Sequence, residues 1–123
     1  MSLEEKEALK KEIASSIHVS MPGTVIAFDS AKGTATIRPA LRRRIGGKVM
    51  QLPLLRDVPV FLPRFTCNCE YGPCAMVVQP GDSCLVVFAD TCIDGWFESG
   101  SDTLPPSDRM HDLSDGFAFV GIR

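Results

Sequence analysis

The chain has 123 residues, which is enough for one domain built around one core. Its hydrophobic share of 45% and its charged share of 23% are ordinary for a soluble globular protein. No apolar run reaches the roughly 18 residues that a membrane helix needs, so we expect no stable membrane association. The start, Met1 to Glu5, lacks the basic-then-apolar layout of a secretory signal, which predicts that the protein is made and first kept in a cytoplasm.

The net charge of -2 is unevenly spread along the chain. Residues 1–69 carry 11 basic and 6 acidic side chains, whereas residues 70–123 carry 2 basic and 9 acidic ones. The two parts therefore differ in sign, at +5 and -7. This pattern is typical of two differently solvated faces, and it also fits complementary surfaces that steer identical subunits together.

Residues 2–18 are predicted to form a helix. Ser2 followed by Glu5 has the spacing of a capping box, in which the two side chains satisfy free amides of the first turn. Leu9, Ile13 and Ile17 recur every four residues and form one narrow apolar stripe. Such a stripe must be buried against the rest of the chain, a copy of itself or another protein.

The remainder of the chain is predicted to be mainly β. Five segments are rich in β-branched or apolar residues and are bounded by turn residues, as strands are. They are residues 23–28, 34–40, 52–62, 83–89 and 117–122. The first two form a hairpin, the prolines of the third indicate an edge or bulged strand, and the fourth is the best candidate for a central strand.

Two segments between these strands have a different character. Residues 42–48 are predicted to be a basic loop, and residues 90–98 a short helix with Asp90 as its N-cap. We therefore expect an N-terminal amphipathic helix over 1–20 and one five-stranded Greek-key barrel of the oligonucleotide-binding (OB) type over 21–123. A small SH3-like barrel would fit the strand pattern nearly as well.

Several longer strings of the sequence are specific when taken in order. They are Pro22-Gly23-Thr24-Val25, Ala35-Thr36-Ile37-Arg38-Pro39-Ala40, Leu52-Pro53-Leu54-Leu55-Arg56-Asp57-Val58-Pro59-Val60, Pro80-Gly81-Asp82-Ser83-Cys84-Leu85-Val86-Val87-Phe88-Ala89-Asp90, Cys92-Ile93-Asp94-Gly95-Trp96 and Arg109-Met110-His111-Asp112-Leu113-Ser114-Asp115-Gly116-Phe117-Ala118. This series resembles the N-terminal OB domain of the membrane-puncturing central spike proteins of contractile-tailed phages.

The resemblance implies a homotrimer in the baseplate of a tail particle, assembled in the cytoplasm of a bacterial host. In that family the OB domain is a collar beneath the baseplate hub protein, carries a needle that pierces the cell envelope, and performs no bond-breaking chemistry. Because the sequence stops at Arg123, where the needle would begin, we expect a collar or adaptor. Two alternatives stay open: a separate spike-tip protein supplies the tip, or the sequence is a shortened form of a longer chain that carries its own needle.

Three cysteines, Cys67, Cys69 and Cys74, form a C-x-C-x4-C pattern in one loop. Thiolates favour zinc or an iron centre, but a structural zinc site needs four ligands. The fourth ligand would have to be His18, Glu70 or His111. Free thiols are the favoured interpretation and no cofactor is expected. A metal site and a Cys67–Cys74 disulfide formed after release from the cell remain alternatives. Cys84 and Cys92 stand among apolar residues and are expected to be small buried hydrophobes.

The segment around His111 invites an acid–base interpretation, because Asp112 and Asp115 could orient a histidine that titrates near neutrality. The sequence lacks the G-x-S-x-G and H-E-x-x-H motifs that would supply a nucleophile or a metal. We therefore expect a structural motif, a hydrogen-bonded turn in which Arg109 and His111 lock this loop to the barrel. The chain is expected not to be an enzyme.

The arginines Arg42, Arg43 and Arg44 suggest a rival function, because OB folds often bind single-stranded nucleic acid. That mode needs aromatic stacking platforms beside the basic groove, and the basic loop contains no aromatic residue. These arginines are therefore predicted to face an acidic neighbour in the trimer or hub, as Leu9, Ile13 and Ile17 are predicted to face an apolar one. Trp96 and Phe97 are expected to plug one end of the barrel.

Overall fold

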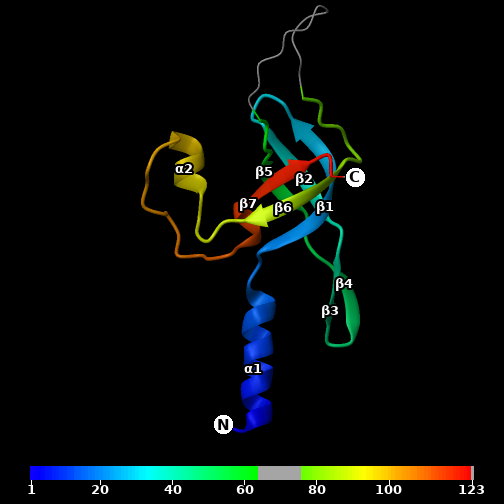
Figure 1. Ribbon diagram of the computed structural model, residues 1–123, viewed down its shortest axis with the longest axis vertical. Coiled ribbons are helices and arrows are strands. Elements are labelled where there is room, and N and C mark those ends of the chain that lie inside the picture. Colours follow the sequence, from blue (N-terminus) through cyan, green and yellow to red (C-terminus); the bar gives the residue numbers. More distant parts are fainter. Residues whose placement is uncertain (64–75, 123) are drawn as a thin grey trace, which may run out of the picture.

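The computed structural model describes residues 1–63 and 76–122, and within them five strands form one curled antiparallel sheet (Figure 1). These strands are β1 (Ser20–Asp29), β2 (Thr34–Pro39), β5 (Leu55–Pro59), β6 (Ser83–Phe88) and β7 (Gly116–Val120). Their order across the sheet is β5-β2-β1-β6-β7. Because β6 returns by a long connection to lie beside β1, the first four strands form a Greek key.

The sheet curls until its two edges meet. Val60, just after β5, forms a parallel bridge with Ala118 of β7, and the Phe61 N–H donates to the Ala118 carbonyl at 2.8 Å. This single contact partly closes the barrel, as in an OB fold. The predicted fold class, one mainly β OB-type barrel with an N-terminal helix, is confirmed.

The core lies inside the curled sheet and follows the alternation of its strands. In β6 every second residue points inward, so Cys84, Val86 and Phe88 are buried beside Val25 and Ile37. Strand β6 pairs with both β1 and β7, which confirms the prediction of a central strand at 83–89. Burial raises the pKa of the Cys84 thiol, which keeps it protonated as the predicted small hydrophobe.

The first hairpin, β1–β2, follows the prediction from residues 23–28 and 34–40. Its turn is held by the Asp29 carboxylate, which accepts from the backbone of Ala31 and Lys32 at 3.0 and 3.3 Å. Gly23 allows β1 and β2 to approach closely, because a Cβ there would lie 2.6 Å from Cγ2 of Ile37. The 52–62 segment gives only the short strand β5, which lies at an edge as its prolines indicated.

The basic segment 42–48 is not a loop, so that prediction is wrong. It contributes to a hairpin of β3 (Arg42–Ile45) and β4 (Lys48–Gln51), joined by Gly46-Gly47. Both glycines have positive φ, at 57° and 80°, as a tight two-residue turn requires. This Gly-Gly turn was the signal in the sequence, and the basic composition concealed it.

Two helices flank the barrel. The first, α1 (Leu3–Ser16), has both hydrogen bonds of the predicted capping box between Ser2 and Glu5. The second, α2 (Asp94–Ser99), has no side-chain cap, and Ile93 holds the N-cap position, so the prediction of Asp90 as N-cap is wrong. The reason is pairing: the Asp90 carbonyl accepts from the His111 N–H, and Thr91 bridges to Met110.

Candidate functional site

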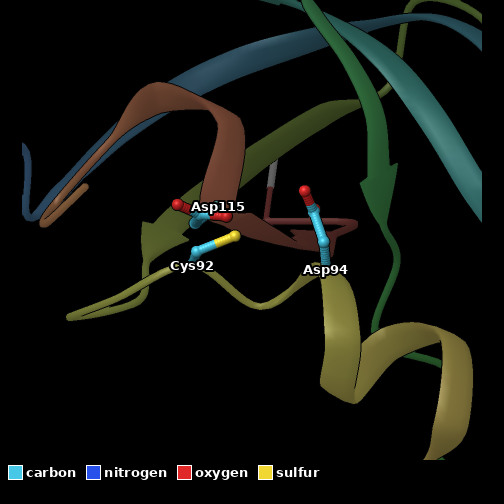
Figure 2. Close-up of side chains that lie close together, drawn as sticks. All are labelled: Cys92, Asp94 and Asp115. Carbon is cyan, nitrogen blue, oxygen red and sulfur yellow. The ribbon is translucent and has the colours of Figure 1, made fainter. Parts of the chain in front are cut away.

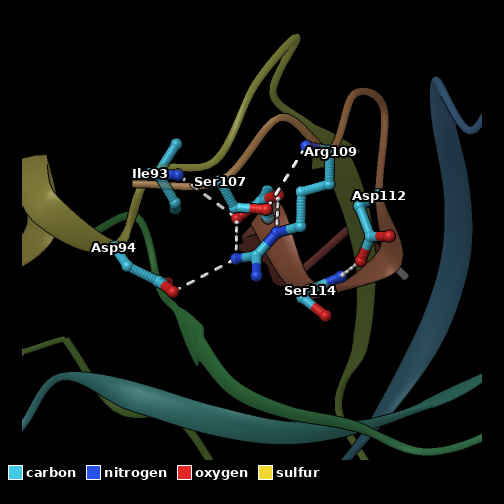
Figure 3. Close-up of polar contacts among 7 residues, drawn as sticks. Ile93, Asp94, Ser107, Arg109, Asp112 and Ser114 are labelled. Carbon is cyan, nitrogen blue, oxygen red and sulfur yellow. Dashed lines mark hydrogen bonds and ion pairs between the residues drawn. The ribbon is translucent and has the colours of Figure 1, made fainter. Parts of the chain in front are cut away.

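The motif predicted around Arg109 forms a cluster centred on Asp115. Figure 3 labels its partners Ile93, Asp94 and Arg109. The Asp115 side chain is fully buried and accepts two hydrogen bonds from Arg109, from Nε and Nη2, each at 2.7 Å. It also accepts from the backbone N–H of Ile93 at 3.2 Å. Arg109 Nη2 reaches Asp94 at 3.2 Å as well. We call these residues, Ile93, Asp94, Arg109 and Asp115, the polar lock.

The polar lock joins segments that are far apart in the sequence. Asp115 ends the 3₁₀ turn η1 (Leu113–Asp115) directly before β7, whereas Asp94 begins α2. The hydrogen bond with Asp115 raises the pKa of Arg109 further above its usual range, so the guanidinium stays charged. A buried carboxylate with this pairing is compensated, and removing either partner would leave an uncompensated charge. The lock therefore holds α2 and its loop to the barrel.

His111 and Asp112 support the turn without forming an acid–base pair. The Asp112 carboxylate accepts from the Ser114 N–H at 2.8 Å, and hydrogen bonds from Ser114 lower the pKa of Asp112. The carboxylate nearest to the His111 ring belongs to Asp90, at 3.9 Å from Nε2. Since Asp112 and Asp115 are bound elsewhere, neither orients this imidazole. His111 contributes through its backbone, which adopts φ 46° and donates to Asp90.

Cys92, Asp94 and Asp115 bring three possible metal ligands within 4.8 Å of one another (Figure 2). Both carboxylates already bind the Arg109 guanidinium, which supplies the positive charge at this point. The cluster therefore acts as part of the polar lock. The three cysteines of the C-x-C-x4-C pattern, Cys67, Cys69 and Cys74, lie outside the described residues, and their metal site remains a prediction.

Helix α1 extends away from the barrel (Figure 1). None of its residues is buried, and the stripe residues Leu9, Ile13 and Ile17 are 43%, 53% and 45% exposed. The described part of the barrel, residues 20–63 and 76–122, therefore does not cover the stripe, and cover by a second copy or by another protein stays a prediction. We call this surface the α1 stripe.

The β3–β4 hairpin braces α1 from the other side. Arg43 Nη2 donates to the Ser15 carbonyl at 2.8 Å, which places a cation at the carboxyl end of the helix. From α1, the space between the two elements is lined by Ala8, Lys11, Glu12 and Ser15, and Leu9 and Ile13 do not line it. Arg42 and Arg44 remain exposed. The contact between the β3–β4 hairpin and α1 thus leaves the α1 stripe exposed.

Trp96 and Phe97 do not plug the barrel, so that prediction is wrong. They are 47% and 46% exposed, and α2 contains no buried residue. Trp96 packs edge-on against Phe117 of β7, with ring centroids 5.8 Å apart. The physical reason is the polar lock, which anchors α2 beside the barrel through Ile93 and Asp94 rather than across its end.

The fold and its internally satisfied polar cluster define a small structural domain of the OB type. The chain belongs to the family described as the phage protein Gp138 N-terminal domain, whose model matches residues 21–121. This match confirms the resemblance to baseplate spike N-terminal domains and identifies the chain as a phage structural protein. None of the curated proteins matches it. Within the described residues, no helix is both long and apolar enough to cross a membrane.

Proposed function

We propose that this protein is a trimeric collar of the central spike in a phage or phage-like contractile tail, joining the baseplate hub protein to the envelope-puncturing tip. The observation that carries the proposal is the exposed α1 stripe on a domain of the phage family. An apolar surface that is exposed in the isolated chain is expected in a virion protein when another subunit covers that surface in the assembled particle.

The role proposed is mechanical and involves no bond breaking by this domain. A closed threefold plug would transmit the thrust of sheath contraction along the tail axis. Helix α1 and the β3–β4 hairpin extend from the same end of the barrel, so both reach toward the same neighbour (Figure 1). The exposed charges of Arg42 and Arg44 would meet acidic groups of that neighbour, whereas the α1 stripe would meet apolar ones.

Single-stranded nucleic acid is a weaker candidate ligand for this OB barrel. Binding of that kind combines cationic and aromatic side chains in one groove. Here the arginines lie on the β3–β4 hairpin, whereas Trp96 and Phe97 lie on α2, on a different part of the molecule (Figure 1). Labelled oligonucleotides should therefore fail to bind at low salt. Salt-dependent binding would favour the nucleic-acid function instead.

The proposal is tested on tail particles purified from the phage that encodes the chain. An antibody against the barrel should label the baseplate end of the tail in electron micrographs, and quantitative mass spectrometry should find three copies per particle. Particles that infect normally and contain no copy of the protein would contradict the proposal.

A further inference from the structure

An apolar groove lies between α2, the residues that follow β5, and β7. It has a volume of about 280 Å³. Its large apolar lining side chains are Phe61, Leu62, Trp96, Phe97, Phe117 and Phe119. Phe61 and Phe119 contact each other across the closure of the barrel, with ring centroids 5.2 Å apart. We call this surface the aromatic groove.

The aromatic groove keeps large side chains partly in water. Phe61 is 54% exposed and Leu62 43%, in addition to the half-exposed rings of α2. Contiguous apolar surface of this kind marks an interaction site more often than scattered single residues do. A cavity of ~150 Å³ accommodates one benzene molecule, so the groove has room for about two large aliphatic side chains. Its size therefore fits the side chains of one helix face.

The charges around the groove select the kind of helix that it would bind. Two acidic side chains, Asp94 and Glu98, stand on α2 beside Trp96 and Phe97. Asp94 is paired with Arg109, whereas Glu98 has no ion-pair partner among residues 1–63 and 76–122. An apolar helix face with a basic border would complement this rim, and nucleic acid would be repelled.

One border of the α1 stripe has that composition. Helical spacing places Lys6 three residues before Leu9 and Lys10 three residues before Ile13, so both lysines border the stripe on one side. Two acidic residues border its other side: Glu5 turns back toward Ser2 in the capping box, and Glu12 lines the space toward the β3–β4 hairpin. Lys10 contacts Glu7 at 3.6 Å, but both side chains are well exposed and this pair is weak.

A chain cannot place its own α1 in its own aromatic groove while the observed contacts persist. Only residues 17–19 connect α1 to β1, and Arg43 holds Ser15 beside the β3–β4 hairpin. In Figure 1, α1 extends below the barrel whereas α2 lies beside it. The helix that enters the groove must therefore come from another molecule.

We propose that the aromatic groove binds the α1 stripe of a second copy of this chain. Leu9 and Ile13 enter the groove, and Lys6 and Lys10 face the acidic side of α2 in a helix-in-groove contact, whereas Ile17 lies just after the end of the helix, in extended backbone. The contact is head to tail, and such contacts form a ring when the rotation between subunits closes. This inference rests on the proposed trimer and assigns the surfaces that hold it together.

Mixing two full-length variants tests this contact. Ile13→Asp places a negative charge in the α1 stripe and leaves the groove intact, whereas Phe97→Asp places a negative charge in the groove and leaves the stripe intact. Both residues are about half exposed, so the barrel tolerates the changes. Leu104→Asp is the matched control, since Leu104 is 91% exposed and belongs to neither surface. Native mass spectrometry would report the species present, and circular dichroism would confirm that each variant is folded.

The wild type and Leu104→Asp should be trimers, and each of the other two variants alone should be a monomer. Their equimolar mixture should give a one-to-one dimer, because one intact helix then meets one intact groove and the ring cannot close. A trimer that persists in Phe97→Asp would overturn the groove assignment and leave the proposed trimer standing. A mixture that stays monomeric would also overturn the assignment. A monomeric wild type would contradict both proposals.

A charge exchange gives a second, independent readout. Lys10→Glu and Glu98→Lys should each weaken self-association by about 2- to 5-fold, as expected for one exposed charge pair. The two changes combined in one chain should restore it. If the double variant is no better than the single ones, Lys10 does not face Glu98 in the assembly.

Discussion

The polar lock and α1 differ in where their side chains find partners: those of the polar lock bind one another, whereas the apolar side chains of α1 have none within the described residues. Asp115 is 0% exposed, and its carboxylate accepts three hydrogen bonds from within the same chain. In α1 no residue is buried, and its apolar stripe contacts water. A region that is complete within one chain serves the stability of that chain. The exposed stripe of α1 adds nothing comparable to that stability, and its proposed role is contact with another subunit.

The largest expected effect breaks the polar lock. Asp115→Ala should lower the free energy of unfolding by about 3–5 kcal/mol, because it removes one partner of a buried ion pair. Urea unfolding at a fixed protein concentration would measure the change. Asp94→Ala, which removes a carboxylate whose side chain is 59% exposed, should cost less than ~1 kcal/mol. Equal costs for the two variants would show that Asp115 is not the centre of the lock.

The next expected effect separates assembly from stability. Ile13→Asp should abolish self-association but change the free energy of unfolding of the monomer by no more than ~0.5 kcal/mol, as is usual for an exposed position. Lys11→Asp introduces the same side chain on the opposite, polar face of α1 and should leave assembly intact. Sedimentation velocity measures assembly. Urea unfolding measures stability, with the equally monomeric Phe97→Asp as the reference, because assembly itself adds to the apparent stability of a trimer. If the barrel of Ile13→Asp does not fold, α1 is needed for stability, which would contradict its assignment to assembly alone.

The smallest expected effect concerns pH and the turn that carries the lock. The pKa of Asp112 in the folded protein lies below its usual value of 3.8, so its contribution to stability is present above that pH. The contribution is lost as pH falls through the lowered pKa. Asp112→Ala should cost about 0.5–1 kcal/mol at pH 7, in the range of a helix-cap residue, and progressively less below pH ~4. A constant difference between the two proteins from pH 7 to pH 2.5 would contradict this role.

Local signals in the sequence predicted the elements whose structure depends on near neighbours. The Ser2–Glu5 capping box, the β1–β2 hairpin and the apolar strand β6 were all found because spacing and composition specify them directly. The β3–β4 hairpin was missed although Gly46-Gly47 marks its turn, because a run of arginines suggested a loop. The start of α2 was missed because Asp90 is used in pairing with His111.

The sites depend on contacts that the sequence does not display. The sequence grouped Arg109 with Asp115 in one turn, but Asp94 and Ile93 join them across 15 and 22 residues. The aromatic groove combines three segments, around Phe61, Trp96 and Phe119, whose proximity follows from barrel closure. One signal was present: Phe117 and Phe119 alternate with the buried Ala118, which places both on the outer face of β7.

The most direct test of the proposed collar is the mass of the full chain in solution, measured by light scattering. We expect a species close to three times the chain mass of 13.4 kDa that persists on dilution. A clean monomer at every concentration would contradict it, because the α1 stripe would then have no partner in its own assembly.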